Sequence, residues 1–220
     1  YFQLGMGNYG KILADGNIST TLENDMEVGA DVHFLSTNGL KKVYDWSSKQ
    51  SAANIGAFLN SYGDSGKFSI NADYGLNDYN YYGIYALTPT SSNVDLQQKT
   101  NRFKINGYYD FYSNEILNDV RLKSSFLSDH FGAKESQAEV LVNLSKHGVE
   151  LSSFDDVRFN ADLGINLETV KSDFDLLDKN SSQFLNATLA PKATFFKGDS
   201  YLMIGSDFSF LNAKNSNMIL

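Results

Sequence analysis

Residues 157–170 alternate between apolar and polar side chains, and this period of two constrains the fold more than any other feature of the chain. One parity carries Val157, Phe159, Ala161, Leu163, Ile165 and Leu167, and the other carries Arg158, Asn160, Asp162, Gly164, Asn166 and Glu168. A period of two places successive side chains on opposite faces of a β-strand. The segment is therefore predicted to be a strand with one apolar face and one polar face.

The same alternation recurs along the chain, and no segment shows the 3.6-residue period of an amphipathic helix. Only two prolines interrupt the sequence, and 13 tyrosines and 16 phenylalanines favour strands. We predict an all-β fold, a long-stranded antiparallel meander that forms one region over residues 1–220. The eleven expected strands are 1–8, 11–22, 26–36, 53–62, 67–85, 101–112, 116–128, 136–145, 157–169, 183–196 and 200–213.

The alternation leaves open what covers the apolar face. A second sheet would make the chain a soluble β-sandwich, whereas lipid would make it part of a transmembrane barrel with a polar lumen. Many expected strands exceed the ~5–6 residues usual in soluble sheets and match the ~9–11 of a tilted membrane strand. The apolar parity is also nearly free of charged residues, each of which would cost about 2–4 kcal/mol at the bilayer midplane. Both observations favour the membrane barrel.

The connections between the expected strands differ in length. Tight connections rich in Gly, Asp and Asn are expected at 24–25, 63–66, 113–115 and 197–199, and longer ones at 37–52, 86–100 and 170–182. This short and long alternation is typical of an up-and-down barrel, with brief periplasmic turns and extended outer loops. The connections 129–135 and 146–156 depart from it.

Composition excludes several functions. The net charge of −8 argues against a nucleic-acid partner, because phosphate binding needs a basic surface. The absence of cysteine excludes disulfides and thiolate chemistry. No Gly-x-Ser-x-Gly motif occurs, and His33, His130 and His147 share no spacing typical of a metal site. We therefore expect neither an enzyme nor a bound cofactor or metal.

Three groups of residues remain as candidates for binding. Asp173, Asp175 and Asp178 could converge on calcium, but they lack the EF-hand spacing, and a solvated acidic loop is the favoured interpretation. Tyr79, Tyr81 and Tyr82 suit either a sugar ligand or an interfacial aromatic girdle, of which the girdle is favoured. The charges expected on the polar parity are Arg102, Lys104, Asp119, Arg121, Lys123, Arg158, Asp162, Glu168, Lys192 and Asp207. Of these, Arg102, Lys104, Arg121, Arg158 and Asp162 are the main candidates for lumen charges.

Short motifs in the first part of the chain resemble the barrel region of TonB-dependent-receptor-like outer-membrane proteins of the Bacteroidota. The matching positions are Gly7-Asn8-Tyr9, His33 to Ser36 and Tyr81-Tyr82-Gly83, and the resemblance is clearest over residues 1–85. Barrels of that family have about 22 strands and enclose a plug. Eleven strands cannot close at that size, and the final run NSNMIL lacks a terminal aromatic residue. We therefore expect a stretch of a longer barrel protein, that is, an incomplete barrel in which no plug or signal peptide is visible.

The resemblance also implies a location and a function. We expect the chain to lie in the outer membrane of a Gram-negative bacterium, to contact the lipid bilayer, and to act in transport or channel formation. One alternative is a barrel subunit or scaffold of a larger assembly for secretion, barrel assembly or nutrient uptake, with other outer-membrane or periplasmic proteins as partners. The other alternative is a soluble β-sandwich that binds carbohydrate or protein.

Overall fold

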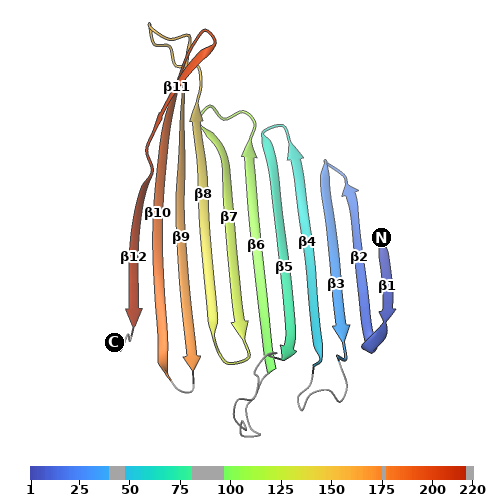
Figure 1. Ribbon diagram of the computed structural model, residues 1–220. Helices are drawn as coiled ribbons and strands as arrows, with labels where there is room; N and C mark the ends of the chain where they lie inside the picture. The colour runs from blue at the N-terminus through green and yellow to red at the C-terminus, as the bar shows by residue number, and fades with distance from the viewer. Residues whose placement is uncertain (40–47, 81–96, 175–176, 217–220) are drawn as a thin grey trace.

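A computed structural model describes residues 1–39, 48–80, 97–174 and 177–216, and it contains one antiparallel sheet in which successive strands are neighbours (Figure 1). The strands are β1 (Phe2–Gly7), β2 (Lys11–Leu22), β3 (Met26–Thr37), β4 (Gln50–Gly63), β5 (Gly66–Asn80), β6 (Gln97–Phe111), β7 (Leu117–Asp129), β8 (Lys134–Lys146), β9 (Asp156–Phe174), β10 (Leu177–Lys197), β11 (Ser200–Gly205) and β12 (Phe208–Ser216). A single 3-10 turn, η1 (Asn8–Gly10), joins β1 to β2. The prediction of an all-β antiparallel meander is confirmed.

The sheet is open within the described residues. β1 pairs only with β2, and β11 and β12 pair only with β10 (Figure 1). The described residues therefore do not form a closed barrel, and the structure shows a single open sheet with two edge regions.

β11 and β12 cross the sheet as a single strand that is interrupted opposite a proline. Gly205 lies opposite Lys192 and Phe208 lies opposite Leu189, so both strands keep the same register on β10. Pro191 lies within this gap and has no N–H to donate to the ladder. Its carbonyl still accepts a hydrogen bond from the Ser206 N–H at 3.1 Å. The expected strand 200–213 is thus present, and Pro191 explains its interruption.

The register assigns every strand residue to one of two faces, because directly opposed residues point to the same side of a sheet. Ile165 lies opposite Val140 and Ala187, and Val140 lies opposite Leu122, so these residues share the apolar face. Asp162 lies opposite Asn143, which lies opposite Asp119, and these residues share the polar face. The alternation predicted from the sequence thus continues across the whole sheet.

Charged residues lie on the apolar face only near the strand ends, among the side chains that the structure describes. At one end they are Asp78, Lys99, Lys134, Lys171 and Lys214, and at the other end they are Lys146 and Lys197. Between these two ends the face carries a continuous band of uncharged and mostly apolar residues. This band includes several large side chains that are exposed, such as Ile18, Ile55 and Ile165.

The strands are staggered, so that the turns at one end advance steadily across the sheet. The turn between β2 and β3 follows Leu22. A line of directly opposed residues that starts at Leu22 and crosses the sheet perpendicular to the strands reaches β10 at Leu189. The turn between β10 and β11 lies eight residues further along, at Lys197. Eight residues at ~3.3 Å rise over eight strand spacings of ~4.8 Å correspond to a strand tilt of about 35°. A tilt of ~35–45° is that of strands in β-barrels.

Local chemistry explains the tight turns. Asn24 and Asp25 have positive φ angles of 61° and 55°, a conformation that Asn and Asp tolerate better than most residues. Gly198 has a φ of 55° in the two-residue turn between β10 and β11. The side-chain oxygen of Asn114 accepts hydrogen bonds from the N–H groups of Ile116 and Leu117 at 3.0 and 2.8 Å. The fourth tight connection expected from the sequence is also present, because Gly63 at the end of β4 pairs directly with Gly66 at the start of β5. All four expected tight connections are therefore confirmed.

The prediction of a long connection at 170–182 is wrong. β9 continues to Phe174 and β10 begins at Leu177, with a register shift between Leu177 and Asn180. The sequence interpretation ended each strand where the apolar alternation ended. A strand that extends beyond the apolar band can have polar residues on both faces, because water covers both of them.

Val157 was expected on the outer apolar surface, and the structure instead buries it completely. The connection 147–155 folds back over it: the Val149 N–H donates to the Val157 carbonyl at 3.2 Å, and the Asp155 N–H donates to the Phe196 carbonyl at 2.9 Å. The Phe154 ring packs 5.1 Å from the Phe195 ring. This local cluster explains why the connection between β8 and β9 is longer than a hairpin turn.

The chain exposes far more surface than a compact domain of its mass. Its accessible area is 15821 Å², whereas a compact globular chain of 24.5 kDa exposes about 10,000 Å². Val157 is the only hydrophobic residue among those described that is buried. The sheet by itself therefore has no hydrophobic core, and its stability depends on whatever covers the apolar face.

The turn at Gly198 yields the first prediction. Gly198→Ala is expected to lower the free energy of unfolding by about 1–2 kcal/mol, because alanine is strained at a positive φ. Gly107→Ala is the matched control, since a Cβ there would meet only Leu122 at an ordinary 3.8 Å. Urea unfolding of both variants, folded in detergent micelles, measures the difference. Equal unfolding midpoints for the two variants would contradict the assigned turn conformation.

Candidate functional site

The five candidate lumen charges all lie on the polar face. Arg102 and Lys104 come from β6, Arg121 comes from β7, and Arg158 and Asp162 come from β9. Arg158 lies near the start of β9, beyond the last residue of β8, so it is distant in register from the two β6 cations. The neighbouring strands β6 and β7 therefore carry Arg102, Lys104 and Arg121, and Arg158 lies far from these three residues.

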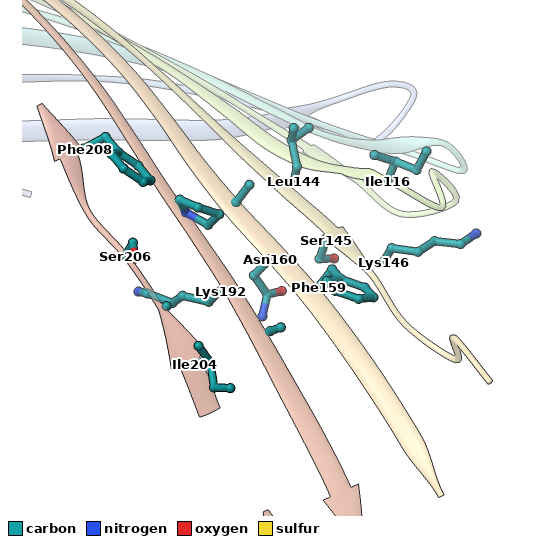
Figure 2. Close-up of a pocket in the computed structure, with 14 residues that line it drawn as sticks. Ile116, Leu144, Ser145, Lys146, Phe159, Asn160, Lys192, Ile204, Ser206 and Phe208 are labelled. Atoms are coloured by element: carbon teal, nitrogen blue, oxygen red, sulfur yellow. The ribbon is translucent and has the colours of Figure 1, made fainter. Parts of the chain in front are cut away.

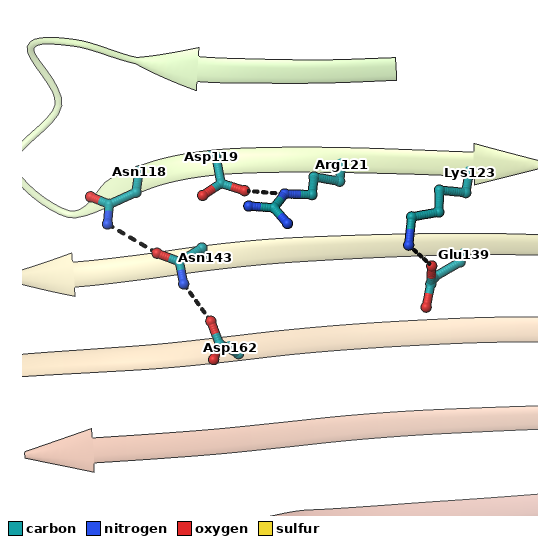
Figure 3. A network of polar contacts seen from close by, with 7 residues as sticks. All are labelled: Asn118, Asp119, Arg121, Lys123, Glu139, Asn143 and Asp162. Carbon is teal, nitrogen blue, oxygen red and sulfur yellow. Dashed lines mark hydrogen bonds and ion pairs between the residues drawn. The ribbon is translucent and has the colours of Figure 1, made fainter. Parts of the chain in front are cut away.

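A chain of polar side chains crosses three strands of this face (Figure 3). The Asn118 amide donates to the Asn143 side-chain oxygen at 2.9 Å, and the Asn143 amide donates to the Asp162 carboxylate. The Ser145 hydroxyl, which is 4% exposed, donates to Asn118 at 2.7 Å. Asp162 is therefore held by a network that links β7, β8 and β9.

Two ion pairs lie beside this network (Figure 3). Arg121 Nε lies 2.9 Å from the Asp119 carboxylate on the same strand, and Lys123 Nζ lies 2.9 Å from Glu139 on β8. Near the start of β9, Arg158 Nε lies 2.8 Å from Asp156, and its guanidinium lies 4.5 Å from the centre of the Phe196 ring. Such exposed pairs contribute little to stability, but they fix the positions of the cations.

Arg102 and Lys104 differ from the three other cations that β6, β7 and β9 carry on the polar face, which are Arg121, Lys123 and Arg158. Both side chains are exposed, and neither makes a hydrogen bond or an ion pair within the described part of the chain. They line a cavity of about 310 Å³ on the polar face together with Asn106, Lys123, Ser125, Glu135, Gln137 and Glu139. This cavity is the candidate functional site.

A larger hollow of about 530 Å³ lies near the other end of the sheet, where β11 and β12 separate (Figure 2). Its wall includes Leu144, Phe159, Pro191, Ile204 and Phe208, all of which belong to the apolar face. An apolar wall cannot satisfy the hydrogen bonds of a polar solute. We therefore regard this hollow as part of the surface that needs an apolar covering and not as a solute site.

The aromatic candidates are placed only in part. Tyr79 lies near the end of β5, opposite Gln50 and Gln98, and its register puts it on the polar face. Tyr81 and Tyr82 lie outside the described residues. An interfacial girdle requires outward aromatic side chains, so the position of Tyr79 fits a ligand contact better than a girdle.

The histidine and aspartate candidates form no metal site in the part of the chain that is described. No group of three or more metal-ligating side chains occurs there. His33 Nδ1 contacts the Asp15 carboxylate across β2 and β3, and His147 Nε2 lies 3.3 Å from the Ser145 hydroxyl. The side chains of Asp173, Asp175 and Asp178 lie outside those described, so the calcium alternative stays untested.

Sequence reasoning missed the partners of the polar face. Asn143, Glu135 and Glu139 were not among the candidates, although each has the polar parity of its strand. Asn118 was missed as well, and it has the apolar parity of β7 because it lies at a bulge. The missing information was the register between β7 and β8, which places Lys123 opposite Glu139 and Asp119 opposite Asn143. A bulge at the start of β7, between Leu117 and Asp119, shifts this register by one residue.

Comparison with known proteins finds no matching family model, no matching curated protein and no matching solved structure. The resemblance to TonB-dependent-receptor-like proteins therefore stays a prediction from short motifs. Separately, no helix within the described ranges is long and apolar enough to cross a membrane.

The network in Figure 3 leads to a second prediction. Asn143→Ala removes the central member, so the Asn118 amide and the Asp162 carboxylate each lose a partner. We expect a loss of about 1–2 kcal/mol in the free energy of unfolding. Asn17→Ala is the control, because Asn17 lies on the same face of β2 and its side chain makes no hydrogen bond within the described residues. Indistinguishable urea midpoints would show that the network does not stabilise the sheet.

Proposed function

We propose that this chain forms part of the wall of a transmembrane β-barrel in a Gram-negative outer membrane, and that the barrel passes polar solutes through a water-filled lumen. The observation that carries the proposal is the charge-free band on the apolar face, bounded by charges near both strand ends. A band of this kind meets lipid at no electrostatic cost, while the polar face meets water.

The height of the band supports this proposal. On β9 the band runs from Phe159, opposite Lys146, to Thr169, which is followed on the same face by Lys171. This stretch is ~33 Å long at ~3.3 Å per residue. With the tilt of about 35–45° expected of barrel strands, its projected height is about 25 Å, which matches the apolar band of outer-membrane barrels.

The topology restricts how such a barrel can close. The sheet makes eleven passes when β11 and β12 are taken as one, so β1 and β12 run in the same direction (Figure 1). Direct pairing of these two edges would create a parallel seam. A fully antiparallel barrel requires an odd number of further strands between them, and a 22-stranded barrel would require eleven. A second copy related by an axis along the membrane normal would again give parallel seams.

The two alternatives make different demands on the same sheet. As a subunit of a larger assembly, the barrel would serve as a scaffold, and its deletion would release copurifying outer-membrane or periplasmic proteins. As a soluble β-sandwich, the chain would need a second layer over the apolar face. The described residues form one layer only, and the exposed area of 15821 Å² includes that face. This observation favours lipid as the covering.

Direct lipid contact is the first test of the barrel. In a Trp46→Phe background, a single tryptophan is introduced at Ile165 on the apolar face or at the neighbouring Asn166 on the polar face. In vesicles that contain brominated lipid, fluorescence of the Ile165→Trp variant is expected to be strongly quenched, because bromine atoms on the acyl chains reach only lipid-facing residues. Asn166→Trp is the matched control at the same depth and is expected to be little affected. Equal quenching, or a detergent-free soluble protein with neither site quenched, would refute the proposal.

A matched pair of leucines gives an energetic test of the same assignment. Leu122 on the apolar face and Leu35 on the polar face are exposed to similar extents in the isolated sheet, 46% and 40%. Leu122→Arg is expected to cost about 2–4 kcal/mol in a lipid bilayer, whereas Leu35→Arg is expected to cost under about 1 kcal/mol. Reversible unfolding in lipid vesicles measures both. A larger cost at Leu35 would invert the assignment of the two faces.

A further inference from the structure

Two unpaired cations stand next to each other on β6. Arg102 and Lys104 are separated by one residue, so they share the polar face at ~6.6 Å along the strand. Neither has a hydrogen-bond or ion-pair partner within the described ranges, whereas Arg121, Lys123 and Arg158 each have a carboxylate partner. Two adjacent cations that form no ion pair repel each other, and a bound anion would relieve this repulsion.

The residues that flank Arg102 across the neighbouring strands carry no charge. Gly75 is the residue directly opposite on β5, so no side chain from that strand stands across from Arg102. Asn54 leans over the space above Gly75, where a Cβ would lie 2.7 Å from the Asn54 side-chain oxygen. On the β7 side, Arg102 lies opposite Leu127, which cannot pair with it. The guanidinium is thus flanked by neutral groups.

Lys104 has one acidic neighbour in the register. Asp73 lies opposite it on β5, but the carboxylate accepts a hydrogen bond from the Asn71 amide at 3.1 Å and makes no ion pair with Lys104 among the described contacts. On the other side Lys104 lies opposite Ser125, whose hydroxyl can donate a hydrogen bond. Lys104 can therefore turn its ammonium group toward the cavity.

The cavity of about 310 Å³ contains further donors. Asn106 and Gln137 contribute amide groups, of which the Gln137 amide also donates to the Asn166 side-chain oxygen at 3.4 Å. Lys123 forms part of the border while paired to Glu139. Glu135 also lines the cavity, and it lies in the same cross-strand row as Arg102, with Leu127 between them. The unpaired groups are thus two cations and one carboxylate, an arrangement that favours an anion over a cation.

We propose that Arg102 and Lys104 bind an oxyanion group, a carboxylate or a phosphate, of a solute that passes along the polar face. The planar guanidinium can hold two oxygens of such a group at once, and the adjacent ammonium adds a second charge-assisted hydrogen bond. Gln137, Asn106 and Ser125 supply neutral hydrogen bonds to the rest of the solute. This assignment rests on the proposed function only in that the polar face lines a water-filled lumen.

The test is calorimetric titration of the full chain, folded in detergent micelles, with inorganic phosphate and with succinate as separate probes at low ionic strength. The double variant R102Q/K104Q is expected to weaken binding of the preferred probe about tenfold or more. The control double variant K67Q/K192Q removes the same net charge from the same face but outside the cavity. It is expected to retain binding within about twofold. The probe that binds more tightly distinguishes a phosphate from a carboxylate as the recognised group.

A third variant tests the role of the remaining carboxylate. E135Q removes a negative charge from the cavity and is expected to tighten binding of both probes several-fold. Equal weakening by the two double variants would show that only the overall charge of the face matters and would overturn the assignment. Absence of saturable binding to the unmodified chain would overturn it as well.

These outcomes are separable from those of the membrane proposal. Titration in micelles requires only the folded sheet, whereas quenching by brominated lipid reports lipid contact at Ile165. Quenching without oxyanion binding would leave the barrel in place and remove the solute site. Oxyanion binding without quenching would preserve the site and refute the barrel.

Discussion

The cross-strand register is the constraint on which the rest of the structure depends. Directly opposed residues of an antiparallel pair lie on the same side of the sheet. The apolar residues of two neighbouring strands therefore share one face only if the register between the strands is kept. From β1 to β12 this condition holds, and a shift of one residue in any strand would place charges such as Asp162 among leucines and isoleucines. The uniform apolar band and the charged polar face are two consequences of one hydrogen-bonded ladder.

Stability of this sheet must come from outside the sheet. Val157, covered by residues 147–155, is the only buried hydrophobic residue among those described, and the chain exposes about half as much surface again as a compact domain of its mass. In water such an apolar face would aggregate or pair with another apolar surface. Lipid is the covering that fits both the height of the band and the stagger of the strands. In the barrel proposal the bilayer takes the place of a core.

The polar face carries structure of its own. Three of its cations are neutralised locally, in the pairs of Arg121 with Asp119, Lys123 with Glu139 and Arg158 with Asp156. The network of Asn118, Asn143 and Asp162 fixes three strands relative to one another. Arg102 and Lys104 are two cations next to each other on one strand, and neither forms an ion pair within the described residues. A face that has only to be wet would gain nothing from such an arrangement. The cavity that they line is the feature on which the oxyanion proposal depends.

The sequence by itself determined the strands, the face of each strand residue and most of the tight turns. Alternation and turn propensity are local properties, because they depend only on residues that are neighbours in the sequence. The sequence therefore placed Arg102, Lys104, Arg121, Arg158 and Asp162 on one face correctly. Only the tertiary structure decided which residues meet across strands. The pairing of Lys123 with Glu139 depends on the register between β7 and β8, and the contact of Asn143 with Asp162 depends on the register between β8 and β9. The burial of Val157 depends on a connection that folds back, and β9 and β10 extend into the segment 170–182 because they pair beyond the apolar band. Register and backbone pairing are non-local, and no periodicity within a single strand encodes them.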